Sequence, residues 1–219
     1  MLFYRASLFS GGDGDMKRES TLYLYEHQRD FFIQEILDVK KSYFEMMKPT
    51  LINVLDSQIE ELEKNYEEHN FFLYRYYRLV KYRHICLQIL SLCEFWEQQV
   101  ISFINGMISL NYLYDRKKIT TYNEMERILM DFYPGWTALK KKLRIEELRC
   151  IVNVIKHSEG KSLERLKKEY PSRINNDIFS FETSMSSEIL NLNEKDIALF
   201  SESLVQFWLN FPVNQHLVR

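Results

Sequence analysis

Glycine and proline are both scarce in this chain, which contains 6 Gly and 4 Pro among 219 residues. Tight turns depend heavily on these two residue types, so few turns can be built and the chain favours a few long elements. Hydrophobic residues make up 46% of the sequence and aromatic residues 15%. This composition can bury a sizeable core, which excludes a disordered protein and fits one large domain.

Cysteine is also rare, and the three cysteines Cys86, Cys93 and Cys150 form no CxxC pair. Scattered thiols in an odd number exclude a disulfide framework and a zinc site, and they indicate a cytoplasmic protein. Cys86 and Cys93 lie seven residues apart on one expected helix, so both should face the same packed surface. The histidines form no HxxxH pair, and we expect neither a metal nor another cofactor.

Long apolar runs and an excess of one charge are missing as well. No uninterrupted apolar stretch approaches the roughly 20 residues that span a bilayer, so we expect no membrane segment. The formal net charge of −2 excludes a protein that coats nucleic acid through bulk charge, while a local basic patch stays open. The motif SGGDGD predicts a flexible lead-in over residues 1–16, before a single helical domain at 17–212 and a tail at 213–219.

The apolar residues that are present recur with a helical period along most of the chain. An amphipathic helix is predicted over residues 20–47. Pro49 should interrupt it, with a second helix starting near that proline. Residues 71–110 contain no proline and predict one very long helix or two with a kink, where Gly106 marks a bend or a close helix contact.

The second half of the chain predicts shorter helices. A loop at 111–121 leads to a helix capped by Thr121 or Asn123, and Tyr-Pro-Gly forms a turn. A further helix runs from about Trp136 to His157, ends at Ser-Glu-Gly, and is followed by a short helix that Ser162 can cap. The segment FSFETSM alternates as a short strand would, and Asn193 caps a last helix that Pro212 stops. We therefore predict an all-α fold, a bundle of long antiparallel helices.

The stretch CIVNVIKHSEGKS, residues 150–162, ends in Gly-Lys-Ser, as phosphate-binding loops do. Such a loop needs a glycine five residues before the Gly of this motif, and Ile155 stands there. It also needs a preceding strand, whereas a helix is expected. The alternative is that Gly160 ends one helix and Ser162 begins the next.

A polar stripe lies on the helix that precedes this motif. At about 100° per residue, Arg149, Asn153, Lys156 and His157 share one arc, next to a core face. Cys150 and Val154 flank this arc on its far side, and these apolar margins motivate a prediction of dimerisation. Alternatively, Asn153 and His157 are satisfied buried polar residues near a helix end, where His157 complements the helix dipole.

Residues 153–160, NVIKHSEG, resemble the signature helix of HEPN proteins. These all-α domains occur in bacterial toxin–antitoxin and phage-defence systems and in some eukaryotic ribonucleases. Their helix carries an Arg, four to six intervening residues and a His, often as Arg-Asn-x-x-x-His. Asn153 and His157 match the Asn and His, and the stretch is similar to a variant Asn-x-x-Lys-His form. The expected arrangement of helices resembles the family over residues 71–170. The match of individual amino acids is confined to residues 153–160.

The resemblance implies a metal-independent ribonuclease that pairs two such helices in a dimer. His157 would position the 2′-hydroxyl or transfer a proton, assisted by Asn153, while an arginine would stabilise the charged transition state. Val152 stands where the family carries that arginine. Arg149 and Lys156 are the basic residues that could substitute for it.

Basic residues interleaved with tyrosines form a second candidate site in RYYRLVKYRH, residues 75–84. Arg75, Arg78 and Lys81 could grip phosphates while the rings stack on unpaired bases. Alternatively, these charges pair with the acidic helix before them. Lys140 and Lys141 form a similar basic patch, or a solvated helix turn.

Two functions follow from these patterns. The first is a HEPN-like protein of a bacterial defence or toxin–antitoxin system that binds or cleaves RNA. The second is a non-catalytic interaction subunit that dimerises or docks on a larger defence or antitoxin protein. The valine at position 152 favours the second function, and the polar stripe favours the first.

Overall fold

The computed structural model describes residues 24–65, 70–110, 113, 117–133, 135–175 and 189–212. These residues are helical almost throughout, and the antiparallel bridge between Ile174 and Leu190 is isolated. The predicted all-α class is therefore confirmed. The predicted lead-in, the C-terminal tail and the segment FSFETSM lie outside the described residues.

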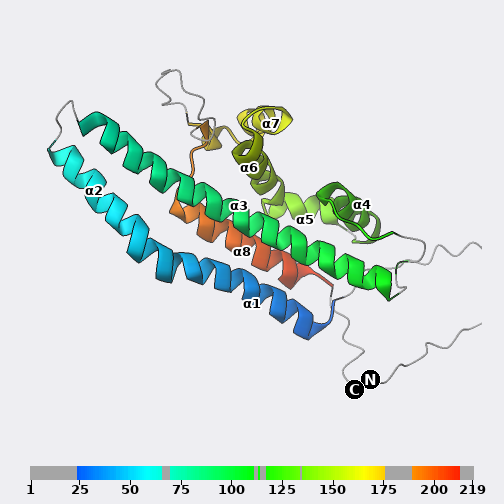
Figure 1. Ribbon diagram of the computed structural model, residues 1–219. Helices are drawn as coiled ribbons and strands as arrows, with labels where there is room; N and C mark the ends of the chain where they lie inside the picture. The colour runs from blue at the N-terminus through cyan, green and yellow to red at the C-terminus, as the bar shows by residue number, and fades with distance from the viewer. Residues whose placement is uncertain are drawn as a thin grey trace, which may run out of the picture.

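The first half of the domain is a long helical hairpin (Figure 1). Its first arm consists of α1 (Glu26–Ser42), η1 (Tyr43–Ile52) and α2 (Asn53–Lys64), which follow one another without a break. Its second arm is α3 (Phe71–Ser109), a single helix of 39 residues. The prediction of one very long helix is confirmed, and an added Cβ at Gly106 would meet nothing within 4 Å, so no close helix contact occurs there.

Pro49 does not interrupt the first arm, so the predicted helix start near this proline is wrong. The helix widens instead into the π-helical turns of η1, and the backbone N–H of Asn53 donates to the carbonyl of Lys48, five residues earlier. Proline lacks the N–H of the α-helical ladder, and the wider turns accommodate that loss. The Thr50 hydroxyl donates to the carbonyl of Met46 at 2.6 Å, which satisfies one acceptor in the altered turns.

The last helix, α8 (Glu194–Asn210), packs against both arms of the hairpin (Figure 1). Trp96 of α3 meets Phe207 of α8 edge-on at 5.2 Å between ring centroids. The indole N–H of Trp208 donates to Gln99 at 3.0 Å, and the Gln99 amide donates in turn to the Phe32 carbonyl of α1. A hydrogen-bonded glutamine in an aromatic core therefore joins three helices.

Four shorter helices follow α3 in the chain: α4 (Tyr122–Phe132), α5 (Trp136–Lys142), α6 (Ile145–His157) and α7 (Lys161–Glu169). Helices α4 and α6 pack on α3, and α7 packs on α6 (Figure 1). Thr121 caps α4 as predicted, because its hydroxyl accepts from the backbone N–H of Glu124 at 3.3 Å. The Glu124 carboxylate accepts from the Thr121 backbone in return, which completes a capping box.

The single helix predicted from Trp136 to His157 is wrong, because the chain breaks at Arg144. This residue has a φ of 58° and separates α5 from α6. Its guanidinium donates to the buried Glu147 at 2.6 and 3.0 Å. Glu147 also accepts from Arg173, which reaches Asp196 in the first turn of α8 at 2.5 Å. A buried network of ion pairs thus stabilises the change of chain direction at Arg144, a position that is neither glycine nor proline.

Asn193 caps α8 as predicted, accepting from the backbone N–H of Lys195 at 3.0 Å. The 3₁₀ turn η3 (Pro171–Arg173) carries Arg173 toward that cap. No helix in the described ranges is long and apolar enough to cross a bilayer. In the same residues, no group of three or more His, Cys, Asp or Glu side chains could hold a metal ion.

Candidate functional site

Helix α6 carries the polar stripe, and it is enclosed by the rest of the chain. Both flanking residues, Arg144 and Ser158, have positive φ, so the helix begins and ends at sharp changes of direction. It packs on α3, α5, α7 and α8. Cys150 and Val154 are buried, so they form no exposed apolar margin, and the surface that motivated the predicted dimer is occupied by the chain itself.

Arg149 points from α6 toward α3, and its guanidinium is ion-paired with Glu97. The central guanidinium carbon also lies over the Tyr122 ring, 3.9 Å from its centroid. Burial is the largest single influence and lowers the pKa of Arg149, but Glu97, Cys93 and Tyr122 together raise the pKa by more, so the net pKa is raised and the charge is retained. A cation held between a carboxylate and an aromatic face is already neutralised and partly shielded from solvent.

Cys93 of α3 completes this cluster. Its thiol lies 3.3 Å from the Glu97 carboxylate, and burial is the main cause that raises the thiol pKa. Cys86 is buried one heptad earlier, so the prediction that both thiols face one packed surface is confirmed. Sequence reasoning did not identify Glu97 or Tyr122 as partners of Arg149, because their positions carry no local motif that points to α6.

Lys156 also faces α3, where its ammonium lies 2.7 Å from the Glu94 carboxylate. The partner of Glu94 therefore comes from a helix that is distant in sequence, where no local spacing could indicate it. The pair is more exposed than Arg149 and Glu97, with side-chain exposures of 32% for Lys156 and 51% for Glu94. A phosphate could therefore compete for Lys156 more readily than for Arg149.

Asn153 lies on the side of α6 that faces α7. Its amide donates to the Ser162 hydroxyl at 3.1 Å, and the Asn153 side chain is half-buried. The Ser162 hydroxyl therefore contacts α6. The prediction that Ser162 caps the next helix is wrong. Helix α7 begins at Lys161 with Gly160 as its N-cap. Gly160 therefore separates the two helices, while Lys161 and Ser162 form the first turn of α7, so the interpretation of this motif as a helix boundary is confirmed.

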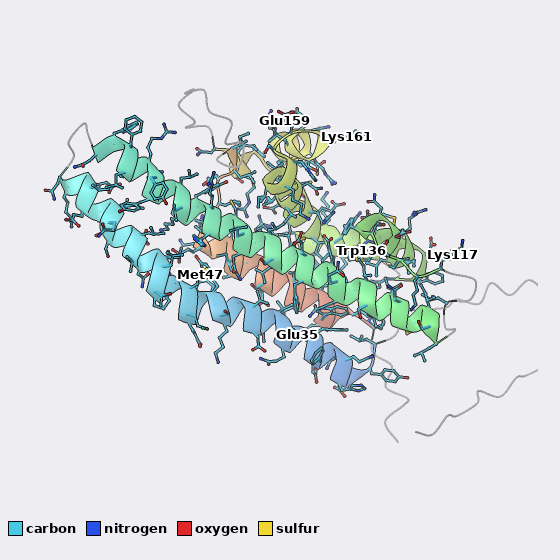
Figure 2. All side chains as sticks on the ribbon, viewed as in Figure 1. Glu35, Met47, Lys117, Trp136, Glu159 and Lys161 are labelled. Atoms are coloured by element: carbon cyan, nitrogen blue, oxygen red, sulfur yellow. The ribbon has the colours of Figure 1, made fainter. Side chains whose placement is uncertain are left out.

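His157 is the last residue of α6, and its side chain is exposed. Figure 2 shows Glu159 and Lys161 at the outer edge of the molecule, where α6 leads into α7. The predicted alternative of a buried and satisfied His157 is therefore wrong, whereas it describes Asn153 well. Lys156 and His157 are the exposed members of the stripe, whereas Arg149 and Asn153 are half-buried.

The other basic candidates lie elsewhere on the molecule. Lys81 pairs with Asp56 of α2 at 2.6 Å, about 20 Å along α3 from Glu94. Arg78 donates to the Tyr74 hydroxyl, which donates to Glu63 of α2. These contacts match the alternative that the charges pair with the preceding acidic helix.

Arg75 and Lys141 are exposed, and Arg75 lies over the ring of Phe71 at 5.7 Å. Lys140 is buried and pairs with Glu126 and Glu146 at 2.7 and 3.1 Å. Arg149, Asn153, Lys156 and His157 share helix α6 as predicted, and the tertiary structure gives each of them different surroundings. It does not bring the basic residues of α3 or α5 to the exposed His157.

Val152 is fully buried on the core side of α6, so an arginine at that position would have no route to solvent beside His157. The chain matches no protein-family model, no curated protein and no solved structure. The HEPN identity stays a prediction from residues 153–160.

Proposed function

We propose that this protein is a HEPN-like binding subunit that does not itself cleave RNA. The proposal depends on one observation: both basic side chains of the polar stripe are paired with carboxylates. Arg149 is held between Glu97 and the Tyr122 ring, and Lys156 is paired with Glu94. Metal-independent cleavage needs a free cation opposite the charge that develops on the scissile phosphate. Neither basic residue of the polar stripe, Arg149 or Lys156, is free to act beside the exposed His157, because each is paired with a carboxylate of α3.

The system in which the subunit acts follows from the resemblance alone. It implies a bacterial defence or toxin–antitoxin system, in which the chain would dock on a larger effector or antitoxin protein. The buried, charge-paired α6 is well suited to hold a fixed shape. A rigid shape lowers the conformational entropy that a partner surface loses on docking.

The second candidate is an RNA-binding protein with cleavage activity, and one observation favours it. His157 is exposed beside the partly exposed Lys156, and an imidazole side chain can both accept and donate a proton. An RNA phosphate would have to displace Glu94 from Lys156. Exposed ion pairs are weak enough for such an exchange.

An RNA cleavage and growth assay separates the two candidates. Wild-type protein, His157→Ala and the matched control His27→Ala, an exposed histidine on α1, are incubated with total RNA and expressed in cells. We expect no cleavage and no growth arrest from any of them. Cleavage by wild type that His157→Ala abolishes and His27→Ala preserves would overturn the proposal in favour of the ribonuclease.

A further inference from the structure

Helices α1 and α3 enclose a shallow groove of about 470 Å³ that opens to solvent, which we call the α1–α3 groove. Within the described residues its lining comes from these two helices alone, so α8 does not cover it. Short side chains produce the hollow, because the exposed Ser42 and Ser91 leave space beside the half-buried Val39 and Phe95. The groove therefore has an apolar floor that the described part of the chain leaves open.

Two carboxylates of α1 line this groove, and one of them, Glu35, is labelled in Figure 2. Glu35 accepts a hydrogen bond from the Gln99 amide at 3.0 Å, and Asp38 accepts one from the Gln34 amide at 2.9 Å. Both partners are neutral amides, and among the described residues neither carboxylate has an ion pair. By contrast, the carboxylates of α3 that face α6 are both paired with cations. The negative charge of the groove is therefore left for a cation from outside.

No lysine or arginine of the described chain lines the groove. One arc of α1, about 60° wide at 100° per residue, carries the residues Phe31, Glu35, Asp38 and Ser42. Lys41 lies beside this arc and is ion-paired with the next turn of its own helix. The arc extends over about 17 Å, or three helical turns, and the 58% exposed Phe31 lies at one end. An acidic face of this length matches one face of a short helix.

We propose that the α1–α3 groove binds a basic helix of a partner protein. Lysine or arginine side chains of that helix lay their aliphatic stems on the apolar floor and donate to Glu35 and Asp38. A helix that lies in a groove is recognised through its side chains, so this mode needs no exposed strand edge. The inference rests on the proposed function, a binding subunit, and it names the surface and the partner chemistry of that subunit.

The charge of the groove disfavours the other classes of occupant. RNA phosphates and anionic membrane surfaces are repelled by the two carboxylates, and the lining supplies no cation to hold them. A second copy of this chain that presented the same face would place its own Glu35 and Asp38 against them. Like charges that face each other across an interface suppress binding. A basic partner removes this repulsion and neutralises both carboxylates.

Binding of a designed peptide tests the groove directly. A fluorescent peptide of about 20 residues is built from Leu, Ala and Lys in an amphipathic helical pattern, and its companion carries Glu in place of every Lys. Fluorescence anisotropy with the full chain should show that the Lys peptide binds at least about 10-fold more tightly than the Glu peptide. This difference should shrink as salt is raised, because exposed charges are screened.

Charge reversal at Asp38 assigns the binding to this groove. Asp38→Lys should weaken binding of the Lys peptide at least about 10-fold, because it replaces attraction by repulsion. Glu202→Lys is the matched control. Glu202 is exposed on α8 and accepts from the Gln206 amide at 2.9 Å, just as Asp38 accepts from Gln34. This variant makes the same change of charge outside the groove and should leave the affinity unchanged.

A bulky residue in the hollow tests the shape of the groove without changing its charge. Ser91→Trp should also weaken the Lys peptide at least about 10-fold, since the ring occupies the space that the partner helix needs. Ser57→Trp on α2 is the matched control. Both serines are exposed and donate to the carbonyl four residues earlier, Ser91 at 2.8 Å and Ser57 at 3.0 Å. Ser57→Trp should bind the peptide as wild type does.

The inference is overturned if the Lys peptide does not bind, or if Asp38→Lys or Ser91→Trp leaves its affinity unchanged. Tighter binding of the Glu peptide, or of RNA that Asp38→Lys strengthens, would assign the groove to an anionic occupant instead. Far-UV circular dichroism establishes that each variant is folded. The RNA cleavage assay reports separately on the proposed function. A protein that binds the Lys peptide and cuts RNA would defeat the proposed function alone, and one that does neither would defeat the groove alone.

Discussion

The guanidinium of Arg149 lies 3.9 Å from the centroid of the Tyr122 ring and is ion-paired with Glu97. This contact joins α6 to α3 and α4 in the interior of the domain. Arg149 therefore acts as a structural cation, and its removal would leave a carboxylate poorly solvated.

Arg149→Ala should lower the free energy of unfolding by about 3 kcal/mol, the scale for breaking a buried ion pair. The side chains of Arg149 and Glu97 are 17% and 12% exposed. Lys156→Ala is the matched control on the same helix and should cost at most about 1 kcal/mol, because exposed pairs are weak. Urea denaturation followed by circular dichroism measures both. Equal losses for the two variants would contradict the structural role of Arg149.

Val152→Arg should not create a ribonuclease, although it restores the arginine of the HEPN motif. Val152 is fully buried, so the new charge would be unpaired in the core and should cost at least about 3 kcal/mol. Val152→Ala leaves a small cavity without a charge and should cost less. Thermal unfolding and RNA cleavage assays check this expectation. A stable Val152→Arg variant that cuts RNA would show that the side chain reaches the surface.

Ser162→Ala should loosen the attachment of α7 to α6. The Ser162 hydroxyl accepts from the Asn153 amide at 3.1 Å, and a hydrogen bond of this kind contributes about 0.5–1.5 kcal/mol. Amide hydrogen exchange should become faster across α7. In the control Ser91→Ala, the lost bond lies within α3, so α7 should exchange as in wild type. An unchanged rate of amide exchange in Ser162→Ala would mean that the burial of Leu163 and Leu166 is sufficient to attach α7 to the domain.

The stability of the protein should fall between pH 9 and pH 11, and Cys86 should contribute to that fall. Burial raises the pKa of the Cys86 thiol from its ordinary value of 9.0 to about 11. The folded state therefore holds this proton more tightly, so the contribution is complete below pH 9 and is lost as the pH rises toward 11. Urea denaturation at pH 8 and pH 10.5 measures the fall. Cys86→Ala should show a smaller fall, and an identical one would exclude the thiol as a cause.

Local signals predicted the helix boundaries that depend on neighbouring residues. Thr121 and Asn193 cap their helices through hydrogen bonds to residues within the next turn, so the sequence contains both partners. The unbroken α3 follows from its helical period and its lack of proline. These interactions extend over three or four positions, so a short stretch of sequence contains all of their partners.

Boundaries that depend on distant residues were not predictable in this way. Arg144 breaks the chain between α5 and α6, and the buried Glu147 that binds it also binds Arg173 near the last helix. Pro49 breaks nothing, because the helix has room to widen into η1. In both cases the packing of remote elements outweighs the local preference.

The sequence by itself determined the all-α class, the long α3 and the placement of Arg149, Asn153, Lys156 and His157 on one arc of α6. Helical period requires nothing beyond the order of the residues. Only the tertiary structure decided what that arc faces. Arg149 and Lys156 meet carboxylates of α3, Asn153 meets Ser162, and His157 meets solvent. The physical reason is that a buried cation needs an opposite charge, and here folding supplies each carboxylate from a helix far away in the chain.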